Sequence, residues 1–137
     1  MRTAFRYFSF SAALLLCTCI ASLGAEFSVS TAQELQNALT TAAANGVDDS
    51  ILVDAGYYTG NFNFSSAESQ ALTLRAADGV EATAVTLDGN GAGRALGITC
   101  SVIADINVQN LTFMRDTGSV DFSGLRVETF GGVEISG

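Results

Sequence analysis

The glycine-rich stretch at residues 85–94, VTLDGNGAGR, is the first candidate for chemistry, because closely spaced glycines can hold a phosphate. A dinucleotide-binding loop needs the pattern G-x-G-x-x-G at the start of a helix, whose N–H groups hold the pyrophosphate. Gly89 and Gly91 fit this spacing, but Arg94 occupies the third position and a strand-like segment follows. A P-loop is also excluded, since the chain has no lysine. We therefore expect the glycines to turn a sharp corner and to bind no cofactor.

The acidic residues are the second candidate, since paired carboxylates catalyse glycoside hydrolysis and clustered ones bind calcium. The carboxylates considered are Asp48, Asp49, Asp54, Asp78, Glu81 and Asp88. No D-x-D-x-D-G calcium loop is present, and the chain has no lysine or histidine to act as a base. Arg75 follows Asp54 by one length of the repeat described below, which predicts that they are neighbours, in a surface ion pair or in a site. We expect no catalytic and no metal-binding residue, although catalysis by aspartates alone stays open.

Aromatic side chains are the third candidate, because their faces can bind sugars. Tyr57 and Tyr58 are adjacent, so in a strand one of them points outward. They are the residues that we predict to face a ligand, a polysaccharide or another cell-surface molecule. The chain has no tryptophan, and its other strand-region aromatics are expected in the core: Phe62, Phe64, Phe113, Phe122 and Phe130.

The segment 1–24 has the order of an export signal. Arg2 and Arg6 give a positive start, an apolar run covers residues 8–20, and small residues follow. Cleavage is expected after Gly24, which gives a signal peptide over residues 1–24. The apolar run is too short to cross a membrane, so no transmembrane span is expected in the mature chain. The product is predicted to be extracellular, periplasmic or at the cell surface.

The cysteines occur in two parts of the chain, the export signal and the segment after it, and each part allows two interpretations. Cys17 and Cys19 lie inside the signal and could mark a lipid attachment site, but Leu16 and Thr18 precede them instead of a small residue. After residue 24 only Cys100 remains, so the mature chain forms no internal disulfide. Its apolar surroundings favour packing in the core, and a reactive or intermolecular thiol is the alternative.

The charge of the chain is strongly one-sided. The chain has six arginines and fourteen acidic residues, which gives a net charge of −8. All fourteen acidic residues follow residue 24. Such a surface excludes nucleic-acid binding through a basic face and electrostatic docking on anionic lipid.

One helix is predicted, over residues 31–45, within an N-terminal cap that spans residues 25–50. Thr31 and Glu34 match a capping box, Leu35 begins an apolar stripe that continues at residues 38, 39 and 42, and Asn45-Gly46 can end the helix. This single apolar face must pack on another element.

Beyond residue 50 the apolar pattern has a period of two and predicts short strands joined by tight corners. The expected strand centres lie at residues 51–53, 62–64, 72–74, 85–87, 96–98, 106–108, 111–113, 125–127 and 133–135. Three pairs of them share nearly the same spacing along the chain: Ile51 to Leu72, Val85 to Ile106, and Leu111 to Val133. A loose repeat of ~20–25 residues indicates a solenoid, and the strand pattern excludes helical repeats.

Several segments then carry a resemblance to a family. They are DDSILVDAGYYTGNF at 48–62, LTLRAADG at 72–79, VTLDGNGAGR at 85–94, INVQNLTF at 106–113 and GLRVETFGGVEISG at 124–137. Together with the export signal and the helix, they resemble the N-terminal part of right-handed parallel β-helix proteins of the pectin-lyase-like kind. The surface, autotransporter-type and polymorphic outer-membrane-type members are the most similar. The resemblance implies an all-β fold, a right-handed parallel β-helix (β-solenoid) of about four coils over residues 51–137, with an N-terminal capping α-helix.

The resemblance specifies the fold better than the activity, because adhesins, lyases and hydrolases share such coils. The function that we expect is a surface or adhesion-type scaffold without catalysis by this chain. The alternative is the N-terminal part of a polysaccharide lyase or glycoside hydrolase whose active site lies beyond Gly137. The last coil has no cap, which predicts a fragment of a longer β-helix, a frayed end, or end-to-end self-association through this coil.

Overall fold

The computed structural model describes residues 23–91, 93–114 and 124–137, and shows a predominantly β chain with one α-helix. The predicted signal peptide therefore lies almost wholly outside the described residues, as does Phe122. The elements are β1 (Ala25–Val29), α1 (Ala32–Ala42), β2 (Asp49–Val53), β3 (Gly56–Thr59), β4 (Phe62–Ser66), β5 (Leu72–Ala76), the 3₁₀ turn η1 (Ala82–Ala84), β6 (Val85–Asp88), β7 (Leu96–Cys100), β8 (Ile106–Gln109), β9 (Thr112–Met114), β10 (Leu125–Glu128) and β11 (Val133–Ser136).

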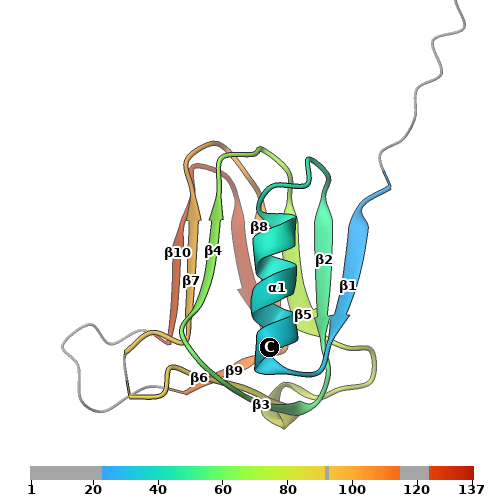
Figure 1. Cartoon of the computed structure of the whole chain (residues 1–137), viewed down its shortest axis with the longest axis vertical. Coiled ribbons are helices and arrows are strands. Elements are labelled where there is room, and N and C mark those ends of the chain that lie inside the picture. Colours follow the sequence, from blue (N-terminus) through green and yellow to red (C-terminus); the bar gives the residue numbers. More distant parts are fainter. Residues whose placement is uncertain (1–22, 92, 115–123) are drawn as a thin grey trace, which may run out of the picture.

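The described strands form three parallel sheets that the chain visits in rotation (Figure 1). The first has the order β1-β2-β5-β8-β11, the second β3-β6-β9 and the third β10-β7-β4. Every pairing between described strands is parallel. The sheets enclose the core on three sides, an arrangement compatible with a β-solenoid, and the expected parallel strands are confirmed.

Equivalent side chains stack from one turn of the chain to the next. In the first sheet Ile51 aligns with Leu74, Leu74 with Val108, and Val108 with Ile135. The first three point inward and are at most 1% exposed. The residues between them face outward, because successive side chains of a strand alternate between its faces. The period-two pattern of the sequence therefore identified the inward positions correctly.

The predicted loose repeat of ~20–25 residues was wrong in its length and in the residues that it aligned. The aligned residues Ile51, Leu74, Val108 and Ile135 are unevenly spaced along the chain, and the step from Leu74 to Val108 is the longest. Val85 lies in the second sheet and does not align with Ile106, which lies in the first. The strands keep a nearly constant length, whereas the corners between them vary, and β6 is preceded by the extra turn η1. The predicted spacing between apolar runs therefore compared strands that belong to different sheets.

Two strands were not predicted. β1 has the sequence AEFSV and β3 the sequence GYYT, and neither contains the aliphatic run that marked the others. β1 extends the first sheet by pairing with β2, and β3 begins the second sheet by pairing with β6. Their pairing with apolar neighbours stabilises strands whose own sequences are weak signals.

The helix begins as predicted and ends earlier. Thr31 is the N-cap, its hydroxyl accepts the Glu34 N–H at 3.2 Å, and Glu34 accepts the Thr31 N–H in return. The last helical residue is Ala42, with Ala43 as C-cap, so the helix stops before the predicted end at residue 45. Gly46 has a φ of +75° and belongs to the turn that leads into β2.

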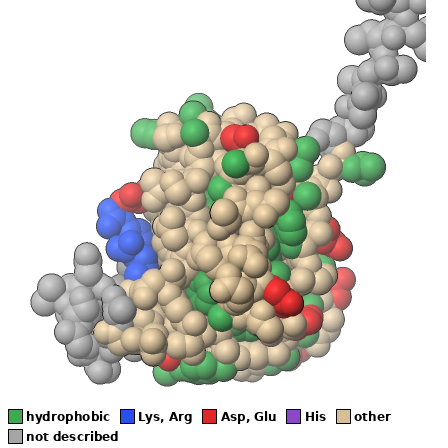
Figure 2. Space-filling model, in the orientation of Figure 1, with side chains coloured by type: hydrophobic (Ala, Val, Ile, Leu, Met, Phe, Trp, Pro, Cys, Tyr) green, Lys and Arg blue, Asp and Glu red, His purple; other side chains and the backbone are tan. Residues whose placement is uncertain are grey.

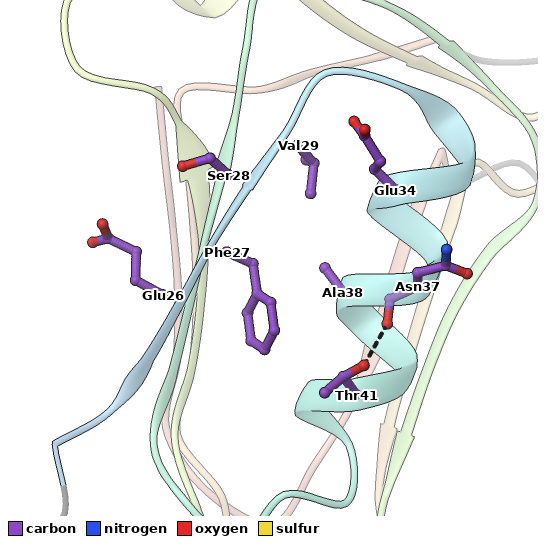
Figure 3. Close-up of a pocket in the computed structure, with 8 residues that line it drawn as sticks. All are labelled: Glu26, Phe27, Ser28, Val29, Glu34, Asn37, Ala38 and Thr41. Carbon is purple, nitrogen blue, oxygen red and sulfur yellow. Dashed lines mark hydrogen bonds between the residues drawn. The ribbon is translucent and has the colours of Figure 1, made fainter.

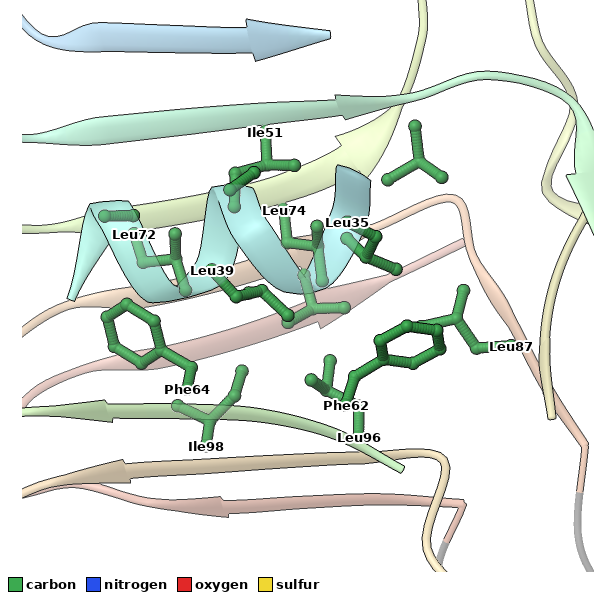
Figure 4. Packing of buried hydrophobic residues seen from close by; sticks show 14 of the residues in the cluster. Leu35, Leu39, Ile51, Phe62, Phe64, Leu72, Leu74, Leu87, Leu96 and Ile98 are labelled. Carbon is green, nitrogen blue, oxygen red and sulfur yellow. The ribbon is translucent and has the colours of Figure 1, made fainter. Parts of the chain in front are cut away.

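The helix covers the first turn of the stack. Its apolar side chains Leu35 and Leu39 are fully buried and lie between those of β2 and β5 on one side and those of β4 on the other (Figure 4). Each such side chain contributes ~1.5–3 kcal/mol of burial free energy. The expected packing of the single apolar helix face is thus confirmed.

Candidate functional site

The outer face of the second sheet carries one of the two predicted ligand-facing residues. Tyr57 and Tyr58 are neighbours on β3 and point to opposite faces, with exposed fractions of 58% and 1%. The buried Tyr58 hydroxyl donates to the Asp54 carbonyl at 2.8 Å and lies 3.2 Å from the Val29 carbonyl. Tyr58 therefore holds the corner between β2 and β3, and only Tyr57 faces solvent.

Tyr57 is fixed in place by residues from the two neighbouring strands. Its hydroxyl donates a hydrogen bond to Oδ2 of Asp88 on β6, and Sδ of Met114 on β9 lies 3.2 Å from the same hydroxyl. The other carboxylate oxygen of Asp88 accepts the Asn90 N–H at 2.9 Å. We call Tyr57, Asp88 and Met114 the Tyr57 cluster. It presents an aromatic face, a carboxylate and a thioether side by side on a sheet.

The hydrogen bond moves both pKa values away from neutrality. The Tyr57 hydroxyl, followed by the Asn90 N–H, lowers the pKa of Asp88 below its ordinary value. The same bond raises the pKa of Tyr57. Near pH 7 the cluster therefore holds a charged carboxylate and a neutral phenol. A general acid or base works best with a pKa close to the working pH, so this pair suits binding better than proton transfer.

The glycine-rich loop that follows Asp88 turns a corner between the second and third sheets. Asn90 and Gly91 have φ values of 53° and 73°, in the left-handed region that glycine and asparagine adopt most readily. A Cβ on Gly89 would come within 2.7 Å of the Gly93 carbonyl oxygen. Strand β7 follows the loop, and not a helix, so no helix N-terminus is available to hold a pyrophosphate. The expectation that these glycines turn a sharp corner is confirmed.

The acidic pair at the start of β2 has a structural role. Oδ1 of Asp48 accepts the Ala71 N–H at 2.9 Å, and Oδ1 of Asp49 accepts the Asn45 side-chain amide at 2.7 Å. Asp49 is only 5% exposed, and desolvation raises its pKa above the ordinary value. Both carboxylates thus tie the start of β2 to neighbouring segments.

The predicted neighbours Asp54 and Arg75 do not form an ion pair. Arg75 aligns with Leu52, because Ile51 of β2 pairs with Leu74 of β5 and not with Leu72 as the predicted repeat requires. Its guanidinium instead binds the carboxylate of Asp78 at 2.6 Å. Within residues 23–91, 93–114 and 124–137, no three His, Cys, Asp or Glu side chains gather closely enough to hold a metal ion.

Cys100 lies in the core, as its surroundings predicted. It is 3% exposed, and desolvation raises the pKa of its thiol, which keeps it protonated at neutral pH. Among the aromatics expected in the core, Phe62 and Phe64 are buried and Phe113 is partly buried. Phe130 was predicted wrongly: it lies in the turn between β10 and β11 and is 77% exposed.

A groove of about 400 Å³ runs between β1 and α1 (Figure 3). Its lining residues are Glu26, Phe27, Ser28, Val29, Glu34, Asn37, Ala38 and Thr41. The Phe27 ring extends from β1 toward the helix, and the Thr41 hydroxyl donates to the Asn37 carbonyl at 2.9 Å. One oxygen of the Glu34 carboxylate, Oε2, accepts hydrogen bonds from Ser30 and Thr31 in the helix cap.

Tyr57 and Asp88 were predicted as separate candidates and not as neighbours, and Met114 was not among the predicted site residues. The missing information was β3, because without that strand the register between residues 57 and 88 cannot be derived. The segment GYYT carries one outward-facing aromatic residue, Tyr57, and lies one turn of the stack before VTLD. This pattern is the sequence signal that could have predicted the cluster.

Comparison with protein-family models, with curated proteins and with solved structures finds no match to this chain. None of the helices in the described part of the chain has the length and apolar character needed to cross a membrane.

Proposed function

We propose that this chain is an exported right-handed parallel β-helix of the pectin-lyase-like kind, with about four coils, which acts as a surface or adhesion-type scaffold. The rotation of the chain through three parallel sheets supports the β-helix. Inward columns such as Ile51, Leu74 and Val108 have the stacking that coils require. The N-terminal segment, with its basic start and apolar run, supports export.

The observation that carries the scaffold function is the Tyr57 cluster. Three parallel strands present Tyr57, Asp88 and Met114 on one outer face, and the hydrogen bond between Tyr57 and Asp88 fixes their orientation before a ligand arrives. Preorganised groups of this kind favour binding because less side-chain entropy is lost. An aromatic face beside a hydroxyl-accepting carboxylate suits a polysaccharide or another cell-surface ligand that carries hydroxyl groups.

The test is binding of the full chain to a panel of neutral and acidic polysaccharides, followed by isothermal titration with the ligands retained. Tyr57→Ala is expected to weaken binding at least tenfold, since it removes the aromatic face and the partner of Asp88. Phe130→Ala is the matched control, because Phe130 is also an exposed aromatic but lies in the turn between β10 and β11, outside the Tyr57 cluster. Equal binding by both variants and the unaltered chain would contradict a role for the cluster.

The alternative is a carbohydrate-active enzyme whose catalytic residues lie beyond Gly137. An assay of this chain on acidic polysaccharides, with and without calcium, tests whether the chain catalyses a reaction by itself. Turnover that Asp88→Asn abolishes would overturn the scaffold proposal and assign catalysis to the described residues.

A further inference from the structure

The two ends of the strand stack differ in how they are covered. At the first end, α1 buries Leu35 and Leu39 over the core. The side chain of Gln36 also binds the edge of β4: its amide nitrogen donates to the Asn63 carbonyl at 3.0 Å, and its oxygen accepts the Asn63 N–H at 3.0 Å. A helix side chain thus takes the place of a neighbouring strand. Edge strands need such protection, because their free backbone groups otherwise pair with another chain.

At the second end, β9, β10 and β11 are the edge strands of the three sheets. The inward side chains of β11 are much more exposed than their partners on β8: Ile135 is 58% exposed against 1% for Val108, and Val133 is 48% exposed against 1% for Ile106. On β10, the inward Leu125 and Val127 are only partly buried. This end therefore combines exposed apolar core positions with strand edges that have no further strand beside them among the described residues.

The first end of another copy is a poor cover for this surface. The solvent-facing side chains of α1 are polar, among them Gln33, Asn37, Thr40 and Thr41. Stacking second end on first end would bury these groups against Val133 and Ile135, at a cost for each polar group left without a partner. Two second ends match better, because each offers apolar side chains and a free strand edge. Such contact between like surfaces has two-fold symmetry and closes at a dimer.

The sequence of β10 fits a two-fold axis at one position. Arg126 and Glu128 are exposed on the outward face and bind each other, with the inward Val127 between them. If two copies of β10 pair antiparallel with Val127 on the axis, Arg126 of each copy lies opposite Glu128 of the other. On the face drawn in Figure 2 the basic atoms gather on the side where Figure 1 labels β10, beside an acidic group.

The neighbouring registers are unfavourable. If the two copies of β10 shift by one residue relative to each other, each outward side chain of one copy lies opposite an inward side chain of the other. Apolar core positions of one copy would then align with solvent-facing positions of the other. An axis at Arg126 opposes two arginines, and an axis at Glu128 opposes two glutamates, both of which destabilise a strand pair. An axis on β11 brings together no opposite charges, since its only charged residue is Glu134.

From this charge complementarity we propose that the end formed by β9, β10 and β11 pairs with the same end of a second copy, about a two-fold axis at Val127. The dimer continues the third sheet across the axis and covers the exposed core positions of both copies. It is a property of the stack itself and does not depend on the ligand-binding function proposed above.

The test uses charge reversal of the full chain and sedimentation equilibrium. Arg126→Glu opposes carboxylates across the axis, and Glu128→Arg opposes guanidinium groups, so each variant alone is expected to raise the dimer Kd about tenfold or more. An equimolar mixture of the two variants brings opposite charges together at both positions and is expected to dimerise again. The double variant R126E/E128R is expected to dimerise like the unaltered chain. Asp78→Arg is the control, because its charge change equals that of Glu128→Arg at an exposed site away from β10.

Recovery in the mixture shows that both variants are folded and that the contact lies between copies, since the pair within one strand cannot produce it. The proposal is overturned if the unaltered chain is monomeric at all concentrations reached. It is equally overturned if the single variants dimerise as well as the unaltered chain, if the mixture stays monomeric, or if the particles grow beyond dimers into open stacks.

Discussion

The hydroxyl of Tyr57 on β3 donates a hydrogen bond to the carboxylate of Asp88 on β6, although the two residues are far apart in the sequence. The two strands pair in parallel, with Thr59 aligned to Asp88, so the phenol reaches diagonally across the sheet face to meet the carboxylate. Because both groups are exposed, the bond shapes the electrostatics of the surface more than the stability of the fold.

Tyr57→Phe is expected to raise the pKa of Asp88 toward its ordinary value, because the hydroxyl that stabilises the charged carboxylate is removed. An NMR titration of the Asp88 carboxyl carbon measures this change. A lowered carboxylate pKa adds stability above the unfolded pKa, and this stability is lost as the pH falls through the folded value. Tyr57→Phe therefore also reduces the loss of stability in acid. Thr59→Val, beside Asp88 on the same face, is the control, and an unchanged Asp88 titration in Tyr57→Phe would contradict the hydrogen bond.

The part of this architecture that sequence could predict rests on short-range patterns. Period-two runs such as the one at residues 72–74 predicted the strands and their inward faces. The capping box at Thr31 and Glu34 predicted the start of the helix. These patterns could not predict the register of the three sheets, because the register depends on the lengths of the corners, which vary from one turn to the next. Tyr57 and Asp88 were recognised singly for the same reason, since their contact requires the register.

The helix glutamine at the edge of β4 makes a local prediction. Gln36→Ala removes two hydrogen bonds to the Asn63 backbone and is expected to lower the free energy of unfolding by about 1–2 kcal/mol. Urea denaturation followed by circular dichroism measures the change. Gln33→Ala is the matched control: it lies on the same helix and bonds only to the Asn37 side chain within the described structure. Equal effects of the two substitutions would show that the contact with Asn63 contributes nothing.

The buried carboxylate Asp49 makes a prediction about pH. Desolvation raises its pKa in the folded state, so it favours folding in its protonated form. Its contribution to stability is therefore fully present below the unfolded pKa, near the ordinary value of 3.8, and is lost as the pH rises through the folded pKa. Asp49→Asn keeps an oxygen for the Asn45 amide and removes the charge. We expect this variant to gain stability over the unaltered chain at pH 7 relative to pH 3.

The measurement for Asp49→Asn is urea denaturation at both pH values, with Asp48→Asn as the control. Asp48 is adjacent and also accepts one hydrogen bond, from the Ala71 N–H, but it is not buried. If Asp48→Asn and Asp49→Asn change stability in the same way between pH 3 and pH 7, burial of Asp49 is not the cause.

The contrast between the inner and the last strand of the first sheet gives a final prediction. Val108 on β8 is 1% exposed, whereas Val133 on β11 is 48% exposed, although both point inward from the first sheet. Val108→Ala is expected to cost about 2 kcal/mol of unfolding free energy, from lost burial and the cavity left behind. Val133→Ala is expected to cost well under about 1 kcal/mol in dilute solution, because solvent already reaches its side chain. Denaturation at low protein concentration, where copies do not pair, measures both, and a cost for Val133→Ala as large as that for Val108→Ala would mean that the last strand is covered within a single chain.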